Sequence, residues 1–247
     1  MSDLESLSSE SRHFHPSEAF KKASNLPLSH YNFLREQFNK NRLETWGRLA
    51  QEELLWDRPF QTVYRGSFEN PQWFQEGFLN ASVQCLDRWM NSSTAQKTAL
   101  IFEGEPGDKQ SLTYQALLKE VTMMAAALRQ LGIHQGDRVA IYLPLIPEMV
   151  IAVLACARVG ATHSVVFAGF SAESLSSRIQ DAGARLLITA DGGWRKGESL
   201  PLKNIADEAV AESPTIEKVI VVRRTGQPVT MQASRDIWWS DLLKEVD

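Results

Sequence analysis

The stretch from Arg138 to Asp191 constrains the fold more than any other part of the sequence. Three short apolar runs, at residues 138–143, 162–167 and 185–190, are separated by two segments with helical spacing. The runs do not alternate strictly between apolar and polar residues, which is typical of strands covered by helices on both faces. The order strand, helix, strand, helix, strand predicts an α/β fold with a doubly wound, mostly parallel sheet and flanking helices.

The predicted helices have capping residues at their ends. The clearest one carries a single apolar stripe with spacings of four, three, four and three, formed by Leu117, Val121, Met124, Leu128 and Leu131. Thr113 suits its N-cap and Gly132 the position after its end. Ser171 and Gly183 suit the same positions of a later helix. Further helices are predicted over residues 148–158 and 202–211, and further strands over 98–103 and 217–222.

The first 98 residues differ from the rest of the chain. Apolar residues at helical spacing between Tyr31 and Leu55 predict one or two amphipathic helices, and residues 80–90 predict another. Residues 56–77 are aromatic and carry Pro and Gly, which favours a loop. We interpret residues 1–98 as a helical, aromatic N-terminal layer and residues 99–247 as the α/β domain.

Composition excludes some classes of function. The net charge of −4 argues against a nucleic-acid partner, which would require a basic face. No apolar run approaches the roughly 18–20 residues that span a bilayer, so no membrane partner is expected. The N-terminus lacks the pattern of a signal peptide, and Cys85 and Cys156 stand in unrelated contexts. We therefore expect a cytoplasmic protein.

Parallel sheets bind ligands at the carboxyl ends of their strands, which draws attention to the loops at residues 143–147, 167–171 and 191–198. Gly169 would allow a ligand to approach the backbone closely. Arg195 and Lys196 follow Trp194, a combination that can hold a phosphate and stack on a base. Judged by its pattern alone, each loop is better explained as an ordinary connection than as a binding site. Because no catalytic triad, carboxylate pair or metal-ligand spacing stands out, we assign no catalytic residue and no metal ligand.

The exact amino-acid sequence of these segments indicates a family, which their pattern of apolar and polar residues does not. The run YLPLIPEMVIAVLACARVGATHSVVFAGFSAESLSSRIQDAGARLLITADGGWRKGE resembles the AMP-forming acetyl-CoA synthetases of the adenylate-forming superfamily. So do WFQEGFLNASVQCLDR at residues 73–88, LTYQALLKEV at 112–121 and LGIHQGDRVAIY at 131–142. The resemblance covers roughly residues 28–247.

The resemblance implies an acid–thiol ligase that makes acetyl-CoA from acetate, ATP and CoA. Acetate attacks the α-phosphate of ATP in the presence of Mg²⁺, and the CoA thiol then displaces AMP from the acetyl-adenylate. The family's basic loop for the CoA nucleotide matches Arg195, Lys196 and Gly197, and its loop beside the pantetheine channel matches Gly169. Glu198 departs from the pattern, because the family usually has a basic residue there.

The family's phosphate loop, which ends in Gly-Lys-Pro-Lys-Gly, is not found in this sequence. We therefore expect an N-terminal portion that ends before the phosphate loop and does not adenylate acetate by itself. Propionyl-CoA synthetase remains an alternative, since the acyl pocket lies outside this sequence. A non-catalytic module that binds CoA or a nucleotide, or an interaction protein that uses the N-terminal layer, are alternatives of another class. The oligomeric state is left open.

Overall fold

The computed structural model describes residues 12–246, and the chain divides into two compact units, Met1–Gly77 and Phe78–Asp247. The division expected at residue 98 differs from this boundary. Residues after Gly77 pack with the second unit because the Asn80 amide donates hydrogen bonds to the carbonyl oxygens of Ala157 and Arg158, at 3.3 and 3.0 Å. The assignment of residues 1–98 and 99–247 to two domains of the family remains a prediction.

The first unit contains three helices and a β-hairpin among its described residues. They are α1 (Glu18–Ala23), α2 (Leu28–Lys40), α3 (Arg42–Glu53), β1 (Thr62–Gly66) and β2 (Pro71–Gln75). The amphipathic helices expected between Tyr31 and Leu55 are present as α2 and α3. The prediction of a loop over residues 56–77 is wrong, because β1 and β2 pair antiparallel within this segment. Gly66 and Pro71 face each other at the end of this ladder, so they bound the strands instead of preventing them.

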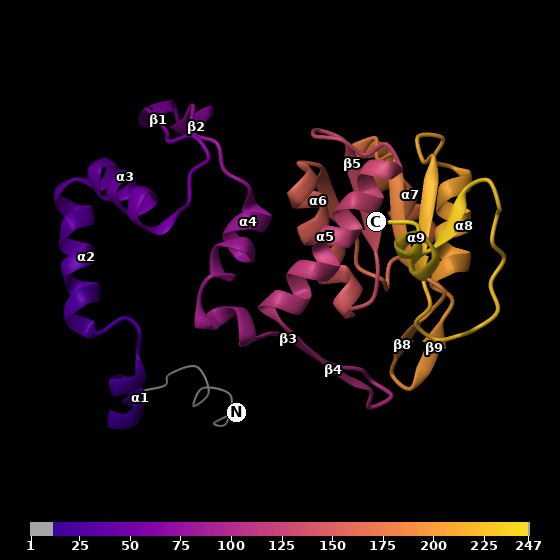
Figure 1. Ribbon diagram of the computed structural model, residues 1–247, viewed down its shortest axis with the longest axis horizontal. Helices are drawn as coiled ribbons and strands as arrows, with labels where there is room; N and C mark the ends of the chain where they lie inside the picture. The colour runs from indigo at the N-terminus through magenta and orange to yellow at the C-terminus, as the bar shows by residue number, and fades with distance from the viewer. Residues whose placement is uncertain (1–11, 247) are drawn as a thin grey trace, which may run out of the picture. The chain divides into compact units, whose positions relative to one another are not determined.

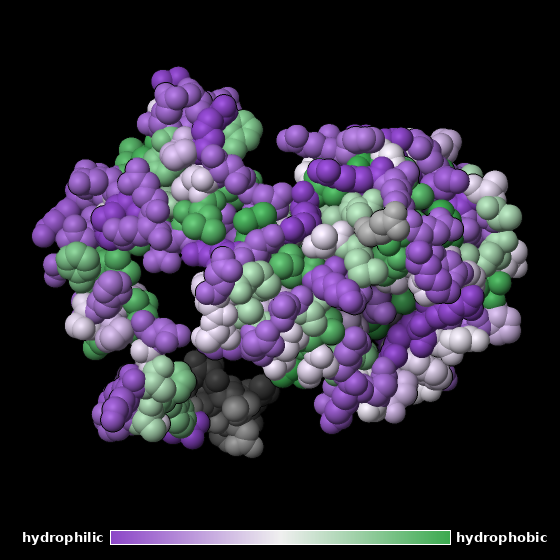
Figure 2. Space-filling view, viewed as in Figure 1, coloured by the Kyte–Doolittle hydropathy of each residue, from purple (hydrophilic) through white to green (hydrophobic). Residues whose placement is uncertain are grey.

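Aromatic side chains hold the hairpin together. The rings of Tyr64 and Trp73 lie across the strands with their centroids 4.8 Å apart, and such cross-strand aromatic pairs stabilise a sheet. Trp46 of α3 meets Trp73 edge-on at 6.3 Å. Figure 2 shows apolar surface remaining on this unit, where Leu43, Trp46, Phe68 and Trp73 are exposed.

The second unit is built on a five-stranded parallel sheet with the order β11-β10-β7-β5-β6. Its strands are β5 (Arg138–Tyr142), β6 (Thr162–Val165), β7 (Leu186–Ala190), β10 (Lys218–Val222) and β11 (Asp236–Trp238). This confirms the predicted fold class. Strand β11 was not predicted from the sequence, because it has only three residues and follows its partner β10 after a long irregular connection over residues 223–235.

Helices cover both faces of this sheet. They are α5 (Tyr114–Gln130), α6 (Pro147–Val159), α7 (Ala172–Ala182), α8 (Leu202–Ala211) and α9 (Trp239–Lys244), while the short α4 (Ala81–Cys85) packs on α6. Figure 1 shows α5 and α6 on one side of the sheet and α8 on the other. Helix α5 packs on α6, and α7 packs on α8. The helix expected over residues 80–90 is shorter than predicted, because α4 ends at Cys85 and a 3₁₀ turn follows over Asp87–Trp89.

The expected caps are confirmed. The hydroxyl of Thr113 accepts a hydrogen bond from the amide of Ala116, and that of Ser171 accepts one from the amide of Ser174. Gly183 ends α7 with a φ of 58°, a conformation that glycine adopts without strain. The strand expected over residues 98–103 is present as β3 (Thr98–Glu103), and it forms an antiparallel hairpin with β4 (Lys109–Thr113) before α5.

The strand order fixes where a ligand can bind. Strand β5, the first strand of the sheet along the chain, lies between β6 and β7. The connection from β5 to β6 therefore runs in one direction across the sheet, and those from β6 to β7 and from β7 to β10 run in the other. Such a reversal opens a crevice at the carboxyl ends of the strands, where doubly wound folds bind ligands. No helix among residues 12–246 has the length and apolar character needed to span a bilayer.

Candidate functional site

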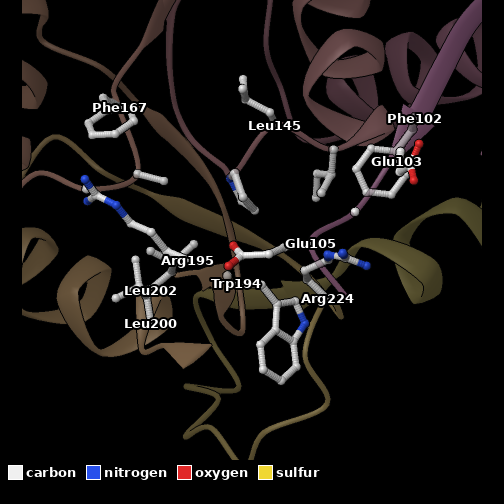
Figure 3. A pocket seen from close by; sticks show the side chains of 16 residues that line it. Phe102, Glu103, Glu105, Leu145, Phe167, Trp194, Arg195, Leu200, Leu202 and Arg224 are labelled. Atoms are coloured by element: carbon white, nitrogen blue, oxygen red, sulfur yellow. The ribbon is translucent and has the colours of Figure 1, made fainter. Parts of the chain in front are cut away.

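A cavity of about 290 Å³ lies at the carboxyl ends of the strands. Four of the segments that line it follow β5, β6, β7 and β10 in turn, and the fifth belongs to the β3–β4 hairpin. Phe102, Leu145, Phe167 and Trp194 give it an apolar wall, and Arg195 and Arg224 supply positive charge. Figure 3 shows the two arginines on opposite sides of the cavity, with Glu105 between them.

The segment after β7 is a β-hairpin rather than the loop expected over residues 191–198. Strands β8 (Gly193–Arg195) and β9 (Glu198–Leu200) pair antiparallel, with Arg195 opposite Glu198. The two residues between them, Lys196 and Gly197, have φ angles of 54° and 80°. Two positive φ angles in a two-residue connection define a tight turn whose twist matches that of the strands. The hairpin therefore presents its side chains from a defined backbone.

Arg195 packs against the loop after β6. Its guanidinium carbon lies 5.4 Å from the centre of the Phe167 ring, within the range of a cation–π interaction. A Cβ atom on Gly169 would lie 2.5 Å from Nη1 of Arg195 and 2.5 Å from Cε1 of Phe167, so a larger residue here would displace these two side chains. The fold thus brings two of the residues singled out in the sequence, Gly169 and Arg195, into contact at the cavity.

The other two singled-out residues do not line the cavity. Lys196 and Gly197 form the tip of the β8–β9 turn, and both are exposed. The amide of Gly197 donates a hydrogen bond to the carboxylate of Glu105, which does line the cavity. The tip is therefore tied to the cavity rim through the backbone of Gly197.

Arg224 is a cavity residue that the sequence analysis missed. It donates two hydrogen bonds to the carboxylate of Asp108, at 2.6 and 2.9 Å, and lies 5.3 Å from the ring centre of Phe102. These hydrogen bonds lower the pKa of Asp108 below its usual value. The sequence signal for Arg224 is its position just after the strand expected over residues 217–222, at a fourth carboxyl end of the sheet.

Arg195 differs from Arg224 in its partners. Within the part of the chain that the structure describes, no carboxylate lies within ion-pair distance of Arg195. Arg195 is therefore the cavity cation whose charge is available to an anionic ligand. Arg224 is already neutralised by Asp108 and acts mainly as part of the wall.

A buried carboxylate joins the segments after β7 and β10. One oxygen of Asp191 accepts hydrogen bonds from the amides of Gly192, Arg224 and Thr225, at 2.7, 2.7 and 2.9 Å. The other oxygen accepts one from the amide of Gly226 at 2.7 Å. Asp191 is 1 % exposed, so water does not compete for these amides. It thereby fixes the start of the β8–β9 hairpin relative to Arg224.

The residues between 12 and 246 contain no group of three or more His, Cys, Asp or Glu side chains that could hold a metal ion. We therefore assign no metal to the cavity. The chemistry that the arrangement supports is recognition of a ligand that carries both an aromatic or apolar portion and a negative charge.

Comparison with known proteins decides the family. A model described as "AMP-binding enzyme" matches residues 86–244, and a model of the acetyl-coenzyme A synthetase N-terminus matches residues 31–85. The chain belongs to the AMP-binding enzyme family. The resemblance to acetyl-CoA synthetases seen in the sequence is thereby confirmed.

Several relatives are similar to this chain along most or all of its length. An acetyl-coenzyme A synthetase of Gemmatimonas aurantiaca is 48% identical over 252 residues, covering 100% of this chain and 38% of the relative. One of Coprinopsis cinerea is 49% identical over 215 residues, covering 86% of this chain and 32% of the relative. The chain thus spans only about a third of the length of these relatives.

A solved structure shares the fold. Acetoacetyl-CoA synthetase from Streptomyces lividans superimposes with a TM-score of 0.80 at 26% identity, over 92% of this chain and 35% of that one. The residues that line the cavity all lie within the segment matched by the AMP-binding enzyme model.

Proposed function

We propose that this chain corresponds to the N-terminal part of an AMP-forming acetate–CoA ligase that works in the cytoplasm. Such a ligase makes acetyl-CoA from acetate, ATP and CoA through an acetyl-adenylate, with Mg²⁺ present. The names of the relatives and the family model support this activity. Free Cys85 and Cys156 agree with a reducing compartment. We assign the acetate, ATP and Mg²⁺ contacts to no described residue.

Within this activity, the cavity binds the nucleotide end of CoA. The observation that carries the proposal is Arg195, a cation without a carboxylate partner among the described residues, next to the aromatic ring of Phe167. Its guanidinium would pair with a phosphate, and the apolar wall would take the base. Gly169 leaves room for the ligand beside the backbone, and Lys196 and Gly197 would contribute charge and amide donors from the hairpin turn.

Titration of the purified chain with CoA by isothermal calorimetry tests the proposal. We expect the R195A variant to bind CoA about tenfold more weakly, because it loses a charged hydrogen bond to phosphate. The matched control is R129A, which removes an exposed arginine of α5 that does not line the cavity. Adenosine 3′,5′-bisphosphate should compete with CoA, whereas pantetheine should not. An absence of CoA binding, or equal affinities of wild type and R195A, would contradict the proposal.

The acidic residue opposite Arg195 should weaken CoA binding. Glu198 faces Arg195 across the hairpin, so its negative charge lowers the local attraction for phosphate. We expect Glu198→Arg to bind CoA about threefold more tightly, which corresponds to roughly 0.7 kcal/mol for an exposed charge. The gain should shrink as salt is raised. Glu208→Arg makes the same change of charge on the exposed face of α8 and should leave the affinity unchanged. A similar gain of CoA affinity in both variants would contradict this prediction, because the net charge of the chain and not the position of Glu198 would then explain the gain.

A further inference from the structure

The loop after β6 is held from below by a buried tyrosine. Tyr142 is the last residue of β5 and is 0 % exposed. Its hydroxyl oxygen lies 2.8 Å from the carbonyl oxygen of Phe170 and 3.2 Å from that of Ala168. A tyrosine hydroxyl has one proton to donate, so the two carbonyls share one donor.

This donor stays protonated over the physiological range. Burial raises the pKa of Tyr142 above its ordinary value, so the phenol does not ionise near neutral pH. The buried site also makes the hydrogen bond costly to lose, since the carbonyl oxygens then lack their donor away from bulk water.

The loop in turn determines where Arg195 lies. Phe167 and Phe170 of the loop pack edge-on with their ring centres 5.6 Å apart, and the amide of Phe170 donates to the carbonyl of Phe167 at 3.0 Å. Arg195 rests on the Phe167 ring and above Gly169. A shift of this loop would therefore move the surface against which the guanidinium packs (Figure 3).

We propose that Tyr142 is a positioning residue for CoA recognition: its hydroxyl fixes the Phe167–Phe170 loop, and the loop fixes Arg195. The inference rests on the proposed CoA site. Tyr142 itself lies beneath the loop and does not line the cavity.

The test compares Tyr142→Phe with the wild-type chain by calorimetric titration with CoA, at a temperature where both are folded. The substitution removes one oxygen atom and keeps the buried ring. We expect Tyr142→Phe to bind CoA about three- to tenfold more weakly, because CoA binding would then have to order a loop that the hydroxyl no longer holds; the loss of one hydrogen bond sets the upper limit. The matched control is Tyr64→Phe, which removes a hydroxyl that donates to the carbonyl of Ser67 in the first unit. Its CoA affinity should equal that of the wild type.

A double-mutant cycle distinguishes positioning from general loosening. If Tyr142 acts through Arg195, Tyr142→Phe should weaken binding clearly less in the R195A background than in the wild type. Fully additive effects, or unchanged affinity of folded Tyr142→Phe, would overturn the inference. If R195A weakens binding and Tyr142→Phe does not, only this inference fails. If neither R195A nor Tyr142→Phe changes the affinity, the proposed CoA site fails with it.

Hydrogen exchange gives a readout that does not depend on CoA. Backbone amides of residues 168–171 should exchange faster in Tyr142→Phe than in the wild type, while those of β10 should be unchanged. Unchanged exchange rates in the loop would overturn the inference. An equal increase in the loop and in β10 would overturn it as well.

Discussion

Replacing Lys203 with methionine should lower the free energy of unfolding by about 3 kcal/mol, because it leaves buried carboxylates without their cation. Lys203 is 0 % exposed. Its ammonium lies 2.9 Å from a carboxylate oxygen of Asp236 and 2.7 Å from both of Asp207. It also donates to the carbonyl oxygen of Thr230 at 3.0 Å. Methionine keeps the length of the apolar stem, so the loss reports on the charge rather than on packing.

Urea unfolding followed by circular dichroism measures this effect. The matched control is Lys244→Met, which removes a lysine that pairs with Asp241 at 2.9 Å on the exposed surface. An exposed pair contributes little, so the control should change the free energy of unfolding by less than about 0.5 kcal/mol. Equal losses in the two variants would show that the buried network does not depend on Lys203. Arg235 also contacts Asp207 and Asp236 and would then be the cation that holds it.

The same network predicts a dependence on pH. Burial alone would raise the pKa of Asp236, but hydrogen bonds from Arg235, the amide of Gln232 and Lys203 outweigh it and lower the pKa below its usual value. A carboxylate with a lowered folded-state pKa contributes stability that is present above its unfolded pKa, about 3.9, and is lost as the pH falls through the folded value. Loss of Lys203 should therefore flatten the fall of stability in acid. A steeper fall in Lys203→Met would contradict this account.

Replacing Asp191 with alanine should also cost about 3 kcal/mol of unfolding free energy. The carboxylate accepts hydrogen bonds from the amides of Arg224, Thr225 and Gly226. In the alanine variant these amides would lose their acceptor at a site that water does not reach. Because the segment after β10 would lose its anchor, CoA binding should weaken as well. Urea unfolding and calorimetric titration measure the two effects.

Asp191→Asn is the informative companion variant. It keeps the shape and one acceptor oxygen, so the three hydrogen bonds to Oδ1 can remain, but its amide group cannot accept from Gly226. We expect a loss of about 1.5 kcal/mol, intermediate between wild type and alanine. Asp241→Ala, which removes an exposed carboxylate of α9, should be close to wild type. If Asp191→Ala is as stable as this control, the carboxylate does not hold the loop.

Local sequence signals succeeded where neighbouring residues decide the conformation. The stripe of Leu117 to Leu131 and the cap at Thr113 predicted α5, and Ser171 with Gly183 bounded α7, because each depends on contacts within one or two turns. The segment at residues 56–77 was misjudged for the converse reason. Gly66 and Pro71 break a helix in any context, but only the pairing of Tyr64 with Trp73 makes the flanking residues a hairpin.

The sequence by itself determined the fold class, the family and two of the residues that meet at the cavity, Gly169 and Arg195. The apolar periodicity and the amino-acid sequence of the loops are local properties that a chain has before it folds. Only the tertiary structure decided that Arg195 has no carboxylate partner among the described residues, whereas Arg224 is neutralised by Asp108. Asp108 and Arg224 lie far apart in the chain, as do Tyr142 and the loop that its hydroxyl supports. Such contacts depend on which strands become neighbours, and no spacing within one segment records that choice.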